Sequence, residues 1–265
     1  MIGVVTLCSA ERVGHVRAQL AALGREPDLG TTVVWVGADS PPSLDADVVL
    51  HLPPTPLGLR LAAARNAGAD AAVAAGADLL IFLDADCVPG PELVARYRDA
   101  ALRHPEAVLC GPVTYLPPGV DVSRPETLVE ATDPHAARPS PAAGSIELAT
   151  VEEYPLFWSL SFAMTAELWA ASPRFDERFE GYGGEDTDFA FGLRDAGIPL
   201  AWVGGAHAYH QHHPTSSPPW QHVDDILRNG RLFADRWGEW PMTGWLADFE
   251  SAGVVRRRGS GWVRA

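Results

Sequence analysis

The strongest constraint on this chain is an apolar run, 79–83, that ends at two carboxylates in alternate positions. The run reads Leu-Leu-Ile-Phe-Leu and is followed by Asp84, Ala85 and Asp86. Five consecutive large apolar residues between polar ones indicate a strand buried on both faces, as in the middle of a parallel α/β sheet. Ligands bind just beyond the carboxyl ends of such strands. We therefore expect Asp84 and Asp86 at a ligand site, with both side chains on the same side of the extended chain.

Two ionised carboxylates this close repel each other, and leaving them unpaired beside an apolar core is costly. A divalent cation would remove the repulsion. Because carboxylates offer hard oxygen ligands, the pair favours Mg²⁺ or Mn²⁺ over zinc. The alternative is that both residues cap a strand or lie in a surface turn, since aspartate is common after strands.

The composition limits the possible functions. The 265 residues, 47% hydrophobic and 20% charged, suit one large α/β domain or a domain with an appended lobe. All 20 basic residues are arginine, which excludes a mechanism that needs a lysine. The net charge of −14 argues against a nucleic-acid partner. The cysteines have no metal-like spacing and no apolar segment is long enough to span a membrane, so we expect a reduced, cytoplasmic setting.

The first half of the chain alternates between strand and helix patterns, which predicts an α/β fold with a mostly parallel central sheet flanked by helices. Strands are expected at 2–7, 32–36, 48–52, 79–83 and 107–113, and helices at 12–23, 57–75 and 92–103. The segment 117–144 has six prolines and no apolar period. It is expected to be a long loop, either a lid over a site or a tolerated insertion.

The second half shows a similar alternation. Ordered structure is expected at 156–164, a helix N-capped by Thr165, a helix from 185 to about 196 and a strand at 199–203. From Trp220 onward, apolar residues recur at roughly helical spacing, which indicates an amphipathic helix packed on the body.

A second group of candidate residues lies at the start of a helix. Gly183 and Gly184 precede Glu185 and Asp186. The positive end of the helix dipole stabilises such carboxylates, and the glycines allow a close backbone approach or a positive φ. A carboxylate held ionised in a cleft suits a general base. The alternative is an ordinary acidic helix N-terminus.

Four histidines, His207, His210, His212 and His213, crowd into seven positions after the strand at 199–203. Histidines at this density are often metal ligands, and one could complete the coordination begun by the paired aspartates. At most one or two of them can reach a single ion, and the spacing leaves open which.

Other residues are candidates for contacts with a nucleotide or a sugar. Arg65, on the predicted helix 57–75, either extends to solvent or points at an anion such as a diphosphate. Asp39, after the second strand, could accept hydrogen bonds from a nucleobase or ribose, or be a simple turn residue. Four aromatic residues could stack on a sugar ring or belong to the core: Trp158, Phe162, Tyr182 and Trp202.

In this order the motifs resemble the GT-A fold glycosyltransferases, especially family 2, with a second half similar to the galactosyltransferase C-terminal region. The resemblance covers roughly residues 1–215. It rests on Arg65-Asn66-Ala67-Gly68, on Leu83-Asp84-Ala85-Asp86, on Phe175-Asp176-Glu177-Arg178-Phe179 before Gly183-Gly184-Glu185-Asp186-Thr187-Asp188-Phe189, and on Tyr209-His210. The ordered combination is more specific than any single part.

The resemblance implies a metal-dependent, inverting glycosyltransferase. It would move a sugar from a nucleoside diphosphate, UDP or GDP, to the hydroxyl of a glycan, a lipid-linked acceptor or a small molecule. Mn²⁺ or Mg²⁺ would be held by Asp84 and Asp86, with Asp86 the more direct ligand. The third ligand would be His210, with His212 as second choice.

The resemblance also assigns roles to the other site candidates. Asp186 would be the base that deprotonates the acceptor, which would be bound by Glu185, Gly184 and Trp158. The donor would be bound by Ser9, Asp39, Arg65 and Asp84. The family often has two acids in the turn that contains Asp39, whereas this chain has Gly37-Ala38-Asp39.

The resemblance divides the chain into a GT-A catalytic domain, 1–215, and a C-terminal helical extension, 216–265. Within the domain, 1–115 would bind the nucleotide sugar, 116–150 would be a flexible loop, and 151–215 would hold the acceptor and the base. The arginines at 256–258 could touch the anionic inner face of a membrane, or form a solvated tail.

Two other functions stay open. A haloacid dehalogenase-like phosphohydrolase also places an Asp-x-Asp motif after an apolar strand, but that family usually needs a lysine. A non-catalytic nucleotide-sugar-binding protein would be expected to have lost the base or a metal ligand, and this chain has all three motifs.

Overall fold

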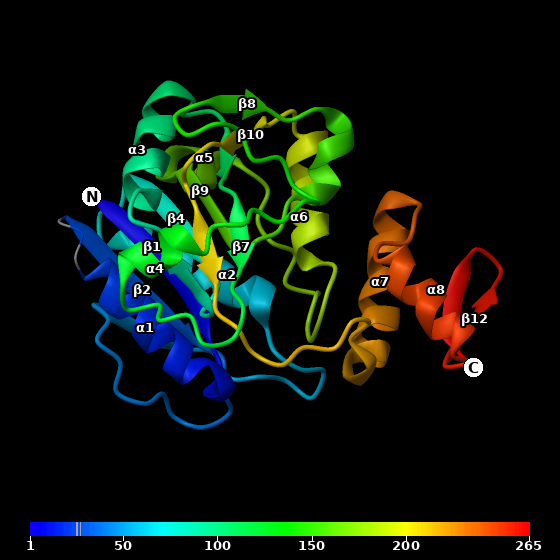
Figure 1. Cartoon of the computed structure of the whole chain (residues 1–265). Helices are drawn as coiled ribbons and strands as arrows, with labels where there is room; N and C mark the ends of the chain where they lie inside the picture. Colours follow the sequence, from blue (N-terminus) through cyan, green and yellow to red (C-terminus); the bar gives the residue numbers. More distant parts are fainter. Residues whose placement is uncertain (25, 27) are drawn as a thin grey trace.

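The computed structural model describes residues 1–24, 26 and 28–265. Within this part of the chain the main sheet has eight strands in the order β3-β2-β1-β4-β9-β6-β10-β8 (Figure 1). Its strands are β1 Ile2–Cys8, β2 Leu29–Trp35, β3 Val48–His51, β4 Leu79–Leu83, β6 Val108–Cys110, β8 Ile146–Leu148, β9 Ser161–Thr165 and β10 Leu200–Val203. Strands β1 to β4 are parallel, and β9 runs antiparallel between β4 and β6. The predicted α/β fold with a mostly parallel central sheet is confirmed.

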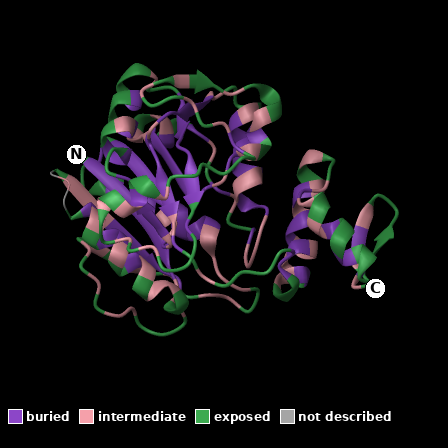
Figure 2. Cartoon of the chain, in the orientation of Figure 1, coloured by how far each residue is buried: buried purple, intermediate pink, exposed green. Residues whose placement is uncertain are grey.

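Helices cover both faces of this sheet, so the buried strands lie between more exposed layers (Figure 2). The helices of the body are α1 Val13–Leu23, α2 Leu61–Ala74, α3 Leu93–Arg103, α5 Ala166–Ala171 and α6 Glu185–Asp195. Along β4, Ile81 packs in the cluster that includes α3, whereas Leu80 and Phe82 pack in the cluster that includes α2 and α6. This two-sided burial is why the 79–83 run has no polar residue. No helix in the described part of the chain is both long and apolar enough to cross a bilayer.

A small second sheet lies beside the main one and joins distant parts of the sequence. It consists of β5 Cys87–Pro89, β11 Ala208–His210 and β7 Val113–Tyr115. The predicted single strand 107–113 is therefore wrong, because it divides into β6 and β7 at Gly111-Pro112. A Cβ at Gly111 would lie 1.9 Å from the carbonyl oxygen of Ala206, and proline has no N–H to continue the ladder.

The segment 117–144, expected to be a loop, contains the short helix α4, Pro125–Glu130. Pro125 occupies the first turn of the helix, where its missing N–H costs nothing. Leu128 on this helix is 2% exposed and packs against Val88 and Leu116. This single apolar contact gives no period in the sequence, which explains why the helix escaped prediction.

The C-terminal extension is a small unit of mixed structure. It contains α7 Val223–Trp237, α8 Thr243–Ser251 and a hairpin of β12 Val255–Arg258 and β13 Gly261–Arg264 (Figure 1). The arginines at 256–258 thus form part of β12 and are not a free tail. Val255 and Trp262, one on each strand, are buried against α7 and α8.

Asp188, on α6, fastens α7 to the body. Its carboxylate is 1% exposed and accepts hydrogen bonds from Arg236 Nη1 at 2.7 Å and Trp237 Nε1 at 2.8 Å. Phe191 and Phe233 pack around this contact. A charge buried this deeply is tolerated because both partners donate to it.

Replacing Asp188 with alanine is expected to lower the free energy of unfolding by about 2–3 kcal/mol, because it leaves the indole N–H of Trp237 unpaired in a buried place. Urea denaturation at pH 7 measures this. The matched control is Asp224→Ala, which breaks the exposed pair with Arg264 and should cost less than about 1 kcal/mol. Equal, small losses in both variants would show that Asp188 does not fasten α7.

Candidate functional site

A cavity of about 420 Å³ opens where β1 and β4 end. It is lined by Leu7, Ser9, Glu11, Arg12, Val36, Gly58, Leu59, Leu61, Arg65, Asp84, Ala85, Asp86, Gly181, Tyr182, His222 and Asp225. The carboxyl edge of a parallel sheet is the expected place for a ligand. Gly181 and Tyr182 come from the loop before α6, and His222 and Asp225 come from the C-terminal extension. Distant parts of the chain therefore close the same cavity.

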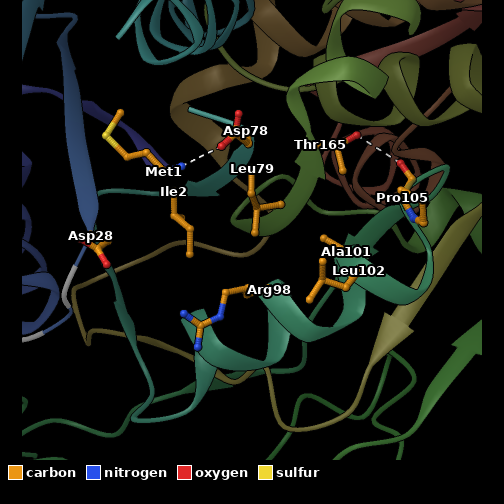
Figure 3. Close-up of a pocket in the computed structure, with 10 residues that line it drawn as sticks. All are labelled: Met1, Ile2, Asp28, Asp78, Leu79, Arg98, Ala101, Leu102, Pro105 and Thr165. Carbon is orange, nitrogen blue, oxygen red and sulfur yellow. Dashed lines mark hydrogen bonds and ion pairs between the residues drawn. The ribbon is translucent and has the colours of Figure 1, made fainter. Parts of the chain in front are cut away.

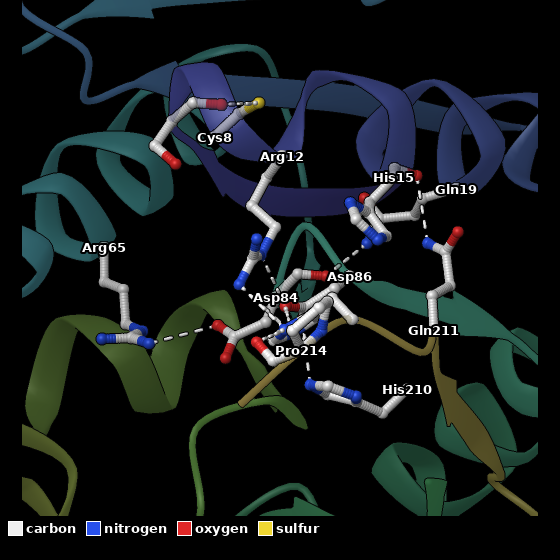
Figure 4. Close-up of polar contacts among 12 residues, drawn as sticks. Cys8, Arg12, His15, Gln19, Arg65, Asp84, Asp86, His210, Gln211 and Pro214 are labelled. Carbon is white, nitrogen blue, oxygen red and sulfur yellow. Dashed lines mark hydrogen bonds and ion pairs between the residues drawn. The ribbon is translucent and has the colours of Figure 1, made fainter. Parts of the chain in front are cut away.

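Asp86 is the centre of a group of possible metal ligands beside this cavity (Figure 4). Its Oδ2 lies 3.0 Å from His213 Nε2, and its Oδ1 lies 3.6 Å from His210 Nε2. One ligand atom from each of Asp86, His210 and His213 falls within 4.8 Å of the others. Arg12 also reaches this carboxylate, with Nε 3.1 Å from Oδ2.

The second sheet holds this group in place. Strand β11 pairs with β5 so that His210 lies opposite Cys87, one residue after Asp86. The backbone N–H of Gln211 donates to the carbonyl of Asp86 at 2.7 Å. The ring of Tyr115 stacks on His210 at 4.4 Å between centroids. The register of three short strands therefore brings His210 to Asp86, and the turn after β11 brings His213.

Electrostatics keep Asp86 ionised. Burial alone would raise the pKa of Asp86, but the hydrogen bond from His213 and the charges of His210 and Arg12 outweigh it and bring the pKa to about 2. Burial lowers the pKa of His210, despite the opposing charge of Asp86. Asp86 is therefore a carboxylate and His210 a neutral imidazole at pH 7, which are the forms that bind metals.

The other histidines of the cluster lie elsewhere. His212, the second candidate, is exposed, and the structure places His213 beside Asp86 instead. His207 is buried and shares a hydrogen bond of 2.7 Å between its Nε2 and Thr114 Oγ1. Burial lowers the pKa of His207 to about 4, so it is a neutral structural residue.

Asp84 does not belong to the ligand group; it pairs with Arg65. Nη2 of Arg65 lies 3.2 Å from Asp84 Oδ1, and Nη1 lies 3.2 Å from Glu185 Oε1. The Arg65 side chain is only 5% exposed, and its guanidinium stands over the ring of Phe175 at 5.4 Å. Arg65 is thus a buried link between the end of β4 and the start of α6, and it also lines the cavity.

The start of α6 depends on glycine. Gly183 and Gly184 have φ values of +88° and +94°, a region that side chains rarely adopt. A Cβ on Gly184 would lie 3.1 Å from the ring of Phe179. The two glycines therefore let the chain turn tightly enough to bring the acidic helix start to Arg65.

Asp186 binds its proton more tightly than an ordinary aspartate does. Burial and the neighbouring carboxylate of Glu185 raise the pKa of Asp186 to about 7, although Arg65 opposes them. Its Oδ1 accepts a hydrogen bond of 2.7 Å from the backbone N–H of Thr187. Such a carboxyl group exchanges a proton near neutral pH, as a general base must.

Three further candidates differ in whether they reach the cavity. Ser9 lines it. Asp39 is exposed and does not line it, and its carbonyl accepts a hydrogen bond of 2.6 Å from Trp35 Nε1. Trp158 is half-buried, two residues before Leu160, whose carbonyl accepts the backbone N–H of Asp84 at 3.0 Å.

A larger cavity, of about 480 Å³, lies at the opposite edge of the sheet, where β1 and β4 begin (Figure 3). Its walls are mostly apolar and include Ile2, Leu79 and Leu102. An ion pair of 2.8 Å at its edge joins the N-terminal amine to Asp78. It lacks the convergent polar groups of the cavity beside Asp86, and we do not assign the chemistry to it.

Comparison with known proteins agrees with this geometry. Residues 51–148 match the family described as Glycosyl transferase family 2. Two proteins named Validoxylamine A glucosyltransferase, from Streptomyces hygroscopicus subsp. jinggangensis (strain 5008) and subsp. limoneus, are each 32% identical over 161 residues. The match covers 54% of this chain but only 37% and 35% of those proteins, so the chain spans little more than a third of their length.

Solved structures show the same fold. S. aureus TarS 1–349 matches with a TM-score of 0.57 at 15% identity, over 88% of this chain and 64% of that chain. GalNAc-T7 with UDP, GalNAc and Mn²⁺ matches with a TM-score of 0.55 at 15% identity, over 89% of this chain and 50% of that chain. The chain has the GT-A glycosyltransferase fold, and its residues 51–148 are similar to glycosyl transferase family 2. These similarities favour a glycosyltransferase over the haloacid dehalogenase-like phosphohydrolase alternative.

This GT-A chain also has site residues that the sequence did not single out. Arg12, His15 and Gln19 lie on one face at the start of α1, and Gln19 donates to the carbonyls of Asp84 and Cys87, both at 2.7 Å. Their spacing of three and four residues was a usable signal for one helix face. Nothing local in the sequence indicated that this face meets the end of β4.

Arg65→Met is expected to lower the free energy of unfolding by about 3–5 kcal/mol, because Glu185 stays buried without its cation. Thermal and urea denaturation measure the loss. The matched control is Arg60→Met, since Arg60 immediately precedes the same helix and is only half-buried. If both variants unfold at the parent denaturant concentration, Arg65 is not a structural link.

Proposed function

We propose that this chain transfers a sugar from a nucleoside diphosphate sugar to an acceptor hydroxyl, with inversion at the anomeric carbon and with a divalent metal ion. One observation carries the proposal. The possible metal ligands at Asp86 and the raised-pKa carboxyl of Asp186 belong to one site, because Arg65 bonds to the end of β4 and to the start of α6. Direct displacement requires the donor and the base to be in the same site.

The ligand group fits a divalent cation. Asp86 offers an anionic oxygen, and His210 and His213 offer imidazole nitrogens. Two imidazoles favour Mn²⁺ over Mg²⁺, which prefers oxygen ligands. When bound, the metal would neutralise the charge that develops on the leaving diphosphate. GalNAc-T7, a structure of the same fold, was solved with UDP and Mn²⁺.

Arg12 is the second positive group for the donor. It lines the cavity and lies beside Asp86, and a guanidinium offers the planar donors that suit contacts with phosphate. A donor phosphate near Asp86 would therefore meet a fixed cation. Ser9 lines the same cavity and can donate a hydroxyl hydrogen bond. TarS 1–349 was solved in complex with UDP-GlcNAc and with UDP, which supports a uridine donor.

Asp186 acts as the base in this proposal. Its carboxylate takes the proton of the acceptor hydroxyl as the oxygen attacks the anomeric carbon. The bond from that carbon to the diphosphate breaks, and the leaving group departs with the bonding electrons on the face opposite to attack. Glu185 and Gly184 would position the acceptor at the start of α6, and Trp158 would stack on it.

Several finer assignments stay predictions. They are the contact of Asp39 with the nucleobase, the choice between UDP and GDP, the chemical nature of the acceptor, and the cytoplasmic location. Non-catalytic binding of a nucleotide sugar is the outcome if donor binds and no transfer follows.

Metal ligation separates His213 from His212. We expect Mn²⁺ to increase the thermal stabilisation by UDP in the parent protein, and Asp86→Asn, His210→Ala and His213→Ala to lose that increase, since each removes a ligand. His212→Ala is the matched control and should behave as the parent, because His212 is exposed. A loss in His212→Ala with none in His213→Ala would reverse this assignment.

Replacing the base tests the chemical step. Asp186→Asn should reduce kcat by about 10²–10⁴-fold while UDP binding is unchanged, because only proton removal is lost. Asp195→Asn, at the exposed end of the same helix, is the control and should keep the parent rate. Transfer at the parent rate by Asp186→Asn would rule out Asp186 as the base.

The pH dependence follows from the raised pKa of Asp186. The base works only when deprotonated, so kcat should rise with pH and level off above about 7. Ionising Asp186 costs more free energy in the folded protein than in the unfolded chain. This loss of stability is fully present above the folded pKa and absent below the unfolded pKa of about 3.9. Asp186→Asn should therefore raise the melting temperature at pH 8 and not at pH 4. A melting temperature unchanged at both pH values would contradict the raised pKa.

A further inference from the structure

Arg138 is a buried cation that the proposed mechanism does not use. The residue is 5% exposed, and among the described residues its three guanidinium nitrogens have no hydrogen-bond partner of normal geometry, although the guanidinium does interact with the thiol of Cys110. The guanidinium lies between two indole rings, 5.2 Å from the centroid of Trp158 and 5.3 Å from that of Trp202. Cation–π contacts offset only part of the cost of burying an unpaired charge.

Among the residues that the structure describes, Arg138 forms no ion pair with a carboxylate. The titratable groups that feel its charge include the Cys110 thiol and the Tyr97 hydroxyl, both buried in the sheet. Burial raises the pKa of Cys110 to about 12 and raises that of Tyr97 as well, so both are neutral at pH 7. The buried indole N–H of Trp202 also lacks an acceptor among the described residues. Arg138 therefore has the weak acceptor of a neutral thiol beside it, and the indole N–H of Trp202 has no acceptor in the described chain.

Arg138 is close to the proposed reaction site. A continuous row of ring contacts runs from the metal-ligand candidate to the guanidinium. His210 stacks on Tyr115 at 4.4 Å, Tyr115 meets His135 at 5.4 Å, and His135 meets Trp158 at 5.0 Å. The guanidinium of Arg138 in turn lies against the ring of Trp158. The unpaired cation thus borders the ring that we assign to the acceptor.

The strap 136–143 that covers Arg138 is anchored at both ends. The backbone N–H of His135 donates to the carbonyl of Val113 at 2.8 Å, and that of Gly144 donates to the carbonyl of Gly204 at 3.0 Å. Between these anchors the described hydrogen bonds are local, from Ala137 and Arg138 to His135 and from Ser145 to Ala142, and Arg138 is the one buried residue. A ligand would therefore reach the guanidinium by a local opening of 136–143 between its two anchors.

We propose that Arg138 binds an anionic group, a phosphate or a carboxylate, on the acceptor. The inference rests on the proposed transferase function, because it places the anion on the molecule that stacks on Trp158. A guanidinium between two indoles is oriented for bidentate contact with either anion, and an incoming anion would give the buried charge the partner it lacks. The acceptor is therefore an anionic compound and not a neutral sugar.

The test uses inorganic phosphate and acetate as probes with the full chain in EDTA, at ionic strength held constant with sodium chloride. Both probes are expected to raise the melting temperature of the parent protein in a saturable way, the better one identifying the anion class. Arg138→Gln should weaken this binding by about tenfold to a hundredfold, as for the loss of a charge-assisted hydrogen bond. Without added anion, Arg138→Gln should melt no lower than the parent, because it removes an unpaired buried charge.

The matched control is Arg174→Gln. Arg174 also stacks on an indole, Trp169 at 4.3 Å, but its charge is paired with Asp70 at 2.6 Å. It should keep the parent response to both anions. Equal anion binding by Arg138→Gln and the parent, or no saturable response in the parent, would overturn the proposal. A lower melting temperature of Arg138→Gln without anion would show that Arg138 only holds the strap down.

The outcome can be separated from that of the proposed function. Stabilisation by UDP with Mn²⁺ tests the donor site and should be the same in the parent and in Arg138→Gln. If UDP fails while phosphate binding depends on Arg138, the transferase proposal fails and the anion site stands. If UDP succeeds and the anion response ignores Arg138, only the inference about the acceptor fails.

Discussion

The buried guanidinium of Arg65 is the contact on which the site depends. It bonds at 3.2 Å to Asp84, at the end of β4, and at 3.2 Å to Glu185, at the start of α6. These elements are far apart in sequence and belong to the two halves that would bind donor and acceptor. Because a buried cation needs anionic partners, the two carboxylates are held on either side of it. The sheet edge and the acidic helix start thereby form one site.

The rest of the site follows from how neighbouring elements meet this link. The small sheet of β5, β11 and β7 brings His210 to Asp86, and α1 contributes Arg12. The C-terminal extension, fastened through Asp188, closes the cavity with His222 and Asp225. Charged groups of both signs thus line the cavity, which suits a metal ion and a diphosphate.

Part of this arrangement can be predicted from the sequence. The 79–83 run predicts a central strand because only a strand buried on both faces lacks polar residues, and Asp86 follows at its functional edge. Which histidines meet Asp86 depends on the register between β11 and β5 and on the turn after β11. The spacing left the choice open and the resemblance implied His210 with His212 second, whereas the fold brings His210 and His213 to Asp86. Arg65 was predicted to meet a diphosphate, yet it is paired within the protein, because its partner Glu185 lies 120 residues away. Long-range pairing of this kind leaves no local pattern.

The most direct test of the account is an anomalous difference map from crystals of the protein grown with Mn²⁺ and UDP. The account predicts a manganese peak bounded by Asp86, His210 and His213, with the diphosphate between that peak and Arg12. A peak at another place, or UDP bound away from the end of β4 with no metal beside Asp86, would contradict it.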